Sequence, residues 1–194
     1  MRHSILALDL ATVTGWAVHS TGMDRPFFGS LDLSGYPAQE SGDPCLDLWN
    51  FMLEKHRLYD FTHVVFEAQH VGLSPPKKGQ QARQINIDTI YKLIGMGTTA
   101  EMFAAACRRA NKTKFPQCFK VHIGTWRSHF IGNGGLGKLL SKQRCIAVCE
   151  AFGWDTFDHN AAEACGILDY FMTLLPGEAR PWRDDTFFGQ RVER

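Results

Sequence analysis

Short apolar blocks, separated by turn residues, dominate the first third of the chain. An apolar run over 4–10 predicts a buried strand, and a second run over 15–20 predicts its neighbour, beyond a turn that ends at Gly15. Alternating apolar and polar residues over 27–33 predict a third strand. The chain is therefore expected to open as an antiparallel meander.

Helical spacing replaces this pattern further along. Between about 44 and 59 the apolar residues recur as on one face of a helix, and Val64–Glu67 is a short apolar run typical of a buried strand. A crossover of this length would place that strand parallel to the first. We expect a polar loop over 69–84, a long helix over about 80–110, a strand over 118–121, and helices over 125–130, 138–152 and 159–175.

These elements predict one α/β domain over 1–177, with a mixed five-stranded sheet of three antiparallel and then parallel strands, flanked by helices. A charged tail over 178–194 would dock on the domain, on a partner or on nothing. The aromatic side chains of Phe27, Phe28 and Trp126 are expected in the core.

Composition narrows the class of protein only slightly. The 194 residues are 44% hydrophobic and carry 21 Lys and Arg against 20 Asp and Glu, so a nucleic-acid site would have to come from local clusters of charge. No signal peptide is visible, and no window reaches the roughly 20 apolar residues of a membrane span. Six scattered cysteines without a Cys-x-x-Cys pair indicate free thiols in the cytoplasm, with Cys145 and Cys149 on one helix face.

Three carboxylates stand in or beside apolar elements. Asp9 ends the first strand, Glu67 ends Val64–Glu67, and Glu163 lies near the start of the last helix. Burying a carboxylate without a partner is costly, so a shared divalent metal pair would account for all three. Taken singly, each carboxylate has a plainer role: Asp9 could cap a turn, and Glu67 or Glu163 could be a solvated side chain. Upstream of Glu163, Asp158 or Asn160 could be the N-cap of the last helix.

The same segments resemble a known family. Residues 5–9 with 13–18 are similar to the first motif of the RuvC-type Holliday junction resolvases, Phe66-Glu67 to the second, and Asn160–Ala164 to the third. The likeness keeps the family's order over roughly 4–175 and implies a ribonuclease H-like fold. Leu10-Ala11 departs from the family's usual Pro-Gly, and Asn160 replaces one of its two paired ligands; phage and prophage relatives tolerate such variation.

The resemblance implies a crossover junction endodeoxyribonuclease that uses two metal ions, acts on four-way DNA junctions as a homodimer, and works in the cytoplasm as a bacterial or phage-encoded protein. The long helix over 80–110 is the expected dimer interface. The catalytic residues would be Asp9, Glu67, Asp158 and Glu163. Mg²⁺ or Mn²⁺ would be held by Asp9, Glu67, Asp158, Asn160 and Glu163, with His159 as an alternative for the fourth ligand.

Basic residues on both sides of the metal segments are candidates for neutralising DNA phosphates without reading sequence. Ordinary solvated charges would look the same. The candidates are Lys77, Lys78, Arg83, Lys138, Lys142 and Arg144, and Gln69 and His70 directly follow the segment of Glu67.

Other functions fit part of this pattern. A nuclease of the same fold could act on flaps, replication forks or RNA–DNA hybrids. A sugar-kinase or actin-like ATPase also begins with an Asp before a Thr/Gly turn, although the second phosphate motif of that fold is not found. A DNA-binding relative that has lost catalysis is the remaining alternative, suggested by Asn160.

Overall fold

The computed structural model of the chain describes residues 2–34, 43–68, 87–156 and 158–184. The strands are β1 (Ser4–Asp9), β2 (Val13–Ser20), β3 (Phe27–Asp32), β4 (His63–Glu67) and β5 (Gln117–Val121). The helices are α1 (Pro44–Tyr59), α2 (Ile87–Asn111), α3 (Ile123–Ile131), α4 (Lys138–Ala151), α5 (His159–Met172) and α6 (Pro181–Asp184).

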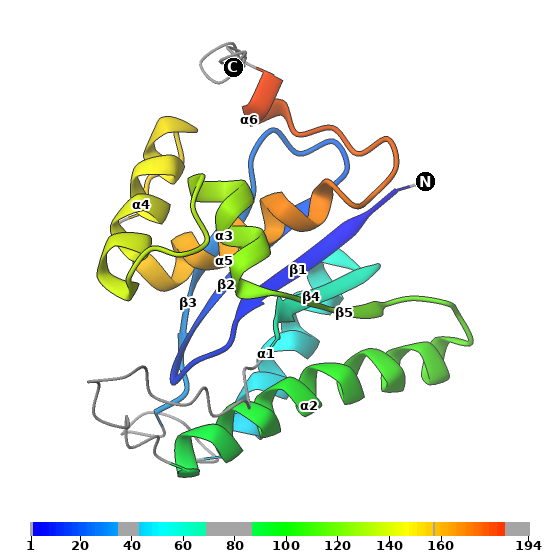
Figure 1. Cartoon of the computed structure of the whole chain (residues 1–194). Helices are drawn as coiled ribbons and strands as arrows, with labels where there is room; N and C mark the ends of the chain where they lie inside the picture. Colours follow the sequence, from blue (N-terminus) through cyan, green and yellow to red (C-terminus); the bar gives the residue numbers. More distant parts are fainter. Residues whose placement is uncertain (1, 35–42, 69–86, 157, 185–194) are drawn as a thin grey trace.

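The strands form one sheet in the order β3-β2-β1-β4-β5 (Figure 1). β1 pairs antiparallel with β2, and β2 pairs antiparallel with β3. β4 lies parallel to β1 on its other side, and β5 lies parallel to β4. The predicted mixed sheet is therefore confirmed, with the meander on one side of β1 and the crossover strands on the other.

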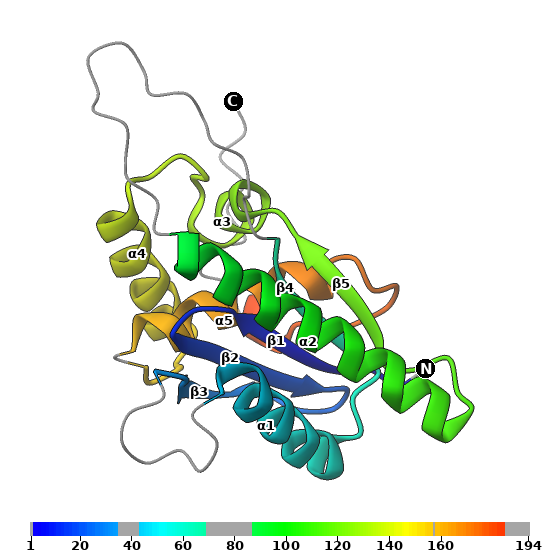
Figure 2. The ribbon, with the colours of Figure 1, turned by 90° about the horizontal axis from the view of Figure 1, so that it is seen from below.

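Helices cover both faces of this sheet. α1 and α2 lie against one face, whereas α3, α4 and α5 lie against the other (Figures 1 and 2). The alternation along β1 explains the two layers: Leu6 and Leu8 join a core that α1 and α2 complete, while Ile5 and Ala7 join the core of α3, α4 and α5. β1 is thus buried on both faces, which fits its unbroken apolar sequence.

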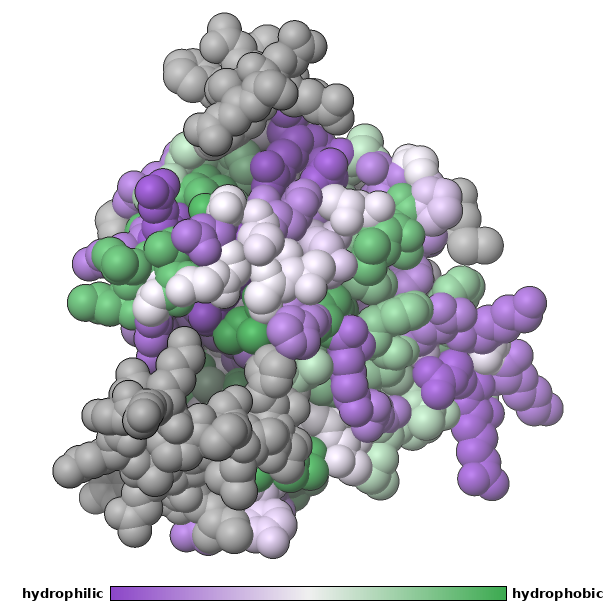
Figure 3. Space-filling view, in the orientation of Figure 1, coloured by the Kyte–Doolittle hydropathy of each residue, from purple (hydrophilic) through white to green (hydrophobic). Residues whose placement is uncertain are grey.

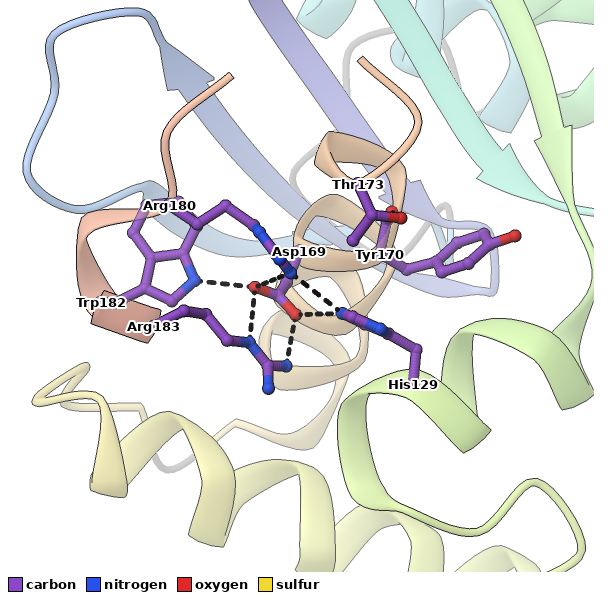
Figure 4. Close-up of polar contacts among 7 residues, drawn as sticks. All are labelled: His129, Asp169, Tyr170, Thr173, Arg180, Trp182 and Arg183. Atoms are coloured by element: carbon purple, nitrogen blue, oxygen red, sulfur yellow. Dashed lines mark hydrogen bonds and ion pairs between the residues drawn. The ribbon is translucent and has the colours of Figure 1, made fainter. Parts of the chain in front are cut away.

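The described part of the tail docks on the domain. Trp182 of α6 is 9% exposed and packs against Trp154 and His19. Its indole Nε1 donates to Oδ1 of Asp169 on α5 at 2.7 Å, and Arg183 and His129 contact the same carboxylate (Figure 4). A fully buried Asp169 therefore joins α6 and α3 to α5.

The structure also tests the predictions made for aromatic side chains and cysteines. Trp126 is buried and Phe28 partly so, as expected, but Phe27 is 54% exposed because it begins the edge strand β3; its prediction was wrong. All six cysteines are free, and Cys145 and Cys149 share the buried face of α4. The described part of the chain contains no helix with the length and apolar character needed to cross a membrane.

Candidate active site

The end of β1 carries the first carboxylate of the site. Asp9 is the last residue of β1 and lies directly across the antiparallel pair from Gly15. The turn between them is closed by Thr14, whose hydroxyl donates to the carbonyl of Ala11 at 2.7 Å. The Thr-Gly pair therefore ends the strand sharply and fixes where the Asp9 side chain begins.

Gly15 also provides room for the start of α5. A Cβ atom at Gly15 would lie 1.9 Å from the carbonyl oxygen of Asn160, so only glycine permits this approach. The helix begins with Asp158 as N-cap, whose carboxylate accepts from the backbone N–H of Asn160 at 2.9 Å. Consequently the first turn of α5 rests on β2, beside the end of β1.

Three predicted carboxylates meet there. Burial raises the pKa of Asp9, and the nearby charges of Glu163 and Glu67 raise it further. Burial also raises the pKa of Glu67, to which Glu163 again contributes. Such mutual effects require neighbouring side chains. The structure thus brings together residues from β1, β4 and α5 that are up to 154 positions apart in the sequence.

Two consecutive residues of α3 bind two of these carboxylates. The indole Nε1 of Trp126 donates to Oε2 of Glu67 at 2.9 Å. The Nη2 atom of Arg127 donates to Oε1 of Glu163 at 2.6 Å, an ion pair whose side chains are only 14% and 5% exposed. Sequence reasoning placed Trp126 in the core and did not single out Arg127, although its position on the short helix after the strand over 118–121 was visible.

α3 reaches the site because it packs closely on α5. A Cβ atom at Gly166 would lie 2.8 Å from ring atoms of both Trp126 and Phe130. Gly166 is one turn beyond Glu163 on α5, so the same small residue that admits the Trp126 ring also brings Arg127 within reach of Glu163.

The donor set suits a hard divalent cation. Asp9, Glu67 and Glu163 offer carboxylate oxygens, which Mg²⁺ and Mn²⁺ prefer. Burial is the main cause of the raised pKa values of Asp9 and Glu67; the charge of Glu163 adds to it, and Arg127 opposes it at both residues. Among the described residues, no three His, Cys, Asp or Glu side chains form a ready-made ligand cluster. Glu67 and Glu163 each accept a hydrogen bond from a donor on α3.

The remaining predicted site residues take several positions. Asp158 caps α5, and His159 and Asn160 are half-buried in its first turn. Lys142 of α4 lies near enough to Asp9 to lower its pKa, against the larger raising effects. Lys138 and Arg144 are exposed on α4. The other predicted contacts lie outside the described residues: Lys77, Lys78, Arg83, Gln69 and His70.

Two solved structures share this architecture. RuvC of Thermus thermophilus, solved in complex with a Holliday junction substrate, superimposes with a TM-score of 0.58, covering 89% of this chain and 96% of that one at 12% identity. The yeast mitochondrial Holliday junction resolvase Ydc2 superimposes with a TM-score of 0.55, covering 93% of this chain and 80% of that one, also at 12% identity. No protein-family model matches the chain, and no curated protein matches it in sequence. The likeness confirms the predicted RuvC-like fold.

Proposed function

We propose that the chain is a structure-selective endonuclease that hydrolyses phosphodiester bonds in branched DNA, with the four-way junction as its main substrate. The observation that carries this proposal is the meeting of Asp9, Glu67 and Glu163 at the end of β1. The fold supports it, because the two similar structures are both Holliday junction resolvases.

Two Mg²⁺ or Mn²⁺ ions would be held by Asp9, Glu67 and Glu163, with Asp158 or Asn160 of the α5 start as a further ligand and His159 as the alternative. When bound, such ions activate a water and stabilise charge on the attacking and leaving oxygens. Asp9 would be the central ligand of the set, because it interacts with both other carboxylates.

The chain's own residues prepare the site for a phosphate. Trp126 orients Glu67 through its indole N–H, and Arg127 holds Glu163. Arg127 and Lys142 both lower the pKa of Asp9, so positive charge lies beside the carboxylate that the scissile phosphate must approach. These residues favour the ionised carboxylates against the opposing effect of burial, and they would draw the phosphate toward the site.

Binding of the DNA backbone is assigned to the basic residues of α4, Lys138, Lys142 and Arg144, together with Lys77, Lys78 and Arg83 outside the described residues. We further propose a homodimer, because two sites related by a two-fold axis could nick opposing strands of one junction. The cleavage would take place in the bacterial cytoplasm, whether the host or a phage encodes the protein.

The test is nicking of a synthetic four-way junction with Mn²⁺ or Mg²⁺. Asp9→Asn is expected to abolish nicking, while Asp24→Asn, which changes an exposed turn residue, leaves it intact. Nicking by the wild type that survives Asp9→Asn would contradict the proposal.

The same assay separates the nearest alternatives. Cleavage of flaps, forks and RNA–DNA hybrids is measured in parallel with cleavage of the junction. Faster cleavage of any of them would identify it as the preferred substrate in place of the junction. The protein would instead be an inactive DNA-binding relative if it binds junctions but cleaves none of these substrates. In that case calorimetry would show no heat of Mn²⁺ binding.

A further inference from the structure

Two leucines project from the first turn of α4. Leu139 is 70% exposed and Leu140 is 54% exposed, although the opposite face of the helix, with Ser141 and Cys145, is buried. Figure 3 shows apolar atoms gathered over the start of α4, at the left of this face. Contiguous exposed apolar surface, especially with a polar rim, is one mark of an interaction site.

Basic side chains border both leucines. Leu139 and Lys142 are three apart, and Leu140 and Arg144 are four apart, so each pair are neighbours on the helix surface. Lys138 precedes them, and the first turn holds no acidic residue. Apolar surface within a positive border is complementary to nucleic acid whose bases are accessible between phosphates.

This surface adjoins the candidate active site. Lys142, one turn beyond Leu139, acts on the pKa of Asp9. The turn before α4 lies tightly against α3, because a Cβ atom at Gly134 would be 2.4 Å from the carbonyl oxygen of Gly124. The leucines are therefore held in place relative to the helix that carries Trp126 and Arg127.

We propose that Leu139 and Leu140 form an apolar wedge against unstacked bases at the branch point of a DNA junction, while Lys138, Lys142 and Arg144 bind the flanking phosphates. The inference rests on the proposed function. Leucine is one of the side chains that proteins insert between base steps. Continuous duplex hides the faces of its bases, so such a wedge favours branched over linear DNA.

The experiment compares binding in EDTA, where DNA stays uncut. The wild type and the double variant Leu139→Ser/Leu140→Ser are titrated against a four-way junction with 2-aminopurine at the branch and against a linear duplex. The double variant is expected to lose about tenfold in junction affinity, together with the rise in 2-aminopurine emission, and to keep its duplex affinity. Leu58→Ser, 67% exposed on α1 across the sheet, is the matched control.

Every other outcome overturns the wedge. Unchanged junction affinity and emission would show that the leucines do not touch the bases. Equal losses of affinity for junction and duplex would show that the leucines contact only the DNA backbone. If the wild type is an oligomer and the double variant is a monomer, a second copy of the chain covers the two leucines. Failure of the wild type to bind any branched DNA would reject the proposed function itself.

Discussion

Single side chains decide how the carboxylates of the site are held. Asp9, Glu67 and Glu163 could be predicted because carboxylates inside apolar segments are unusual and call for a partner. The contacts of Trp126 and Arg127 could not be predicted. A tryptophan on a short helix is as readily explained by core packing, and an arginine by exposure to solvent. Their roles depend on the distance between α3 and α5, which sequence spacing does not reveal.

Trp126→Phe keeps an aromatic ring and removes the N–H that binds Glu67. We expect the rate of junction nicking to fall about tenfold because Glu67 loses its orienting donor, and the free energy of unfolding to fall by about 1 kcal/mol. Nicking assays and urea unfolding measure the two effects.

Trp182→Phe is the matched control, because it removes an equivalent N–H from Asp169, outside the carboxylate cluster. It should lower stability and leave nicking by the folded protein unchanged. Equal loss of nicking in both variants would show that the Trp126 contact has no special role.

His63 makes stability depend on pH. It is 4% exposed, its ring lies among those of Phe115, Phe119 and Phe171, and burial and then the charge of His3 lower its pKa to about 4. The unfolded chain takes up the proton near pH 6.5, so stability present above that pH is lost as the pH falls toward 4. The hydroxyl of Thr62 contacts Nδ1 of His63 at 2.8 Å.

Between pH 7 and pH 5 the free energy of unfolding of the wild type should drop by about 2 kcal/mol more than that of His63→Phe. Urea unfolding at both pH values measures the difference. His19, whose pKa burial also lowers, remains in both proteins and cancels. Parallel pH profiles for the two proteins would refute the assignment to His63.

At the scale of elements, the site depends on how closely α5 lies on β2 and α3. The strands and long helices could be predicted because each has a distinct apolar period. α6 could not, because four residues show no period and its place depends on the tertiary contacts of Trp182 and Arg183 with Asp169. Gly15 and Gly166 permit the close approaches of α5 to β2 and to α3, which no apolar period in the sequence reveals.

Gly15→Ala should displace the start of α5, because the added methyl would overlap the carbonyl of Asn160. We expect the free energy of unfolding to fall by roughly 3 kcal/mol. Gly137→Ala is the control: nothing lies within 4 Å of its Cβ position and its φ of −60° suits alanine. Its cost should stay below about 1 kcal/mol. Similar losses in the two variants would contradict the close packing at Gly15.

For the whole molecule, the outer surface of α2 is the interface that our proposed homodimer requires. Tyr91, Ile94 and Met102 share one stripe of this helix and are 66%, 37% and 61% exposed. α1 and the sheet take up its other side. An apolar stripe of this length is typical of a helix that packs on a second helix.

Tyr91→Ser/Met102→Ser should convert a dimer into a monomer in sedimentation velocity, because it removes apolar area from the interface. Paired nicks in one junction should become single nicks. Leu174→Ser, 55% exposed beyond α5, serves as control and should leave the dimer intact. A wild type that sediments as a monomer at micromolar concentration would exclude this interface.

The spread of the site residues along the chain also affects folding. Asp9 lies on β1 and Glu67 on β4, whereas Glu163 lies on α5. Because a domain generally folds as a unit, the three carboxylates come together only when α5 packs on β2. Any metal binding by this cluster would therefore report the completed fold of the domain and not its early strands.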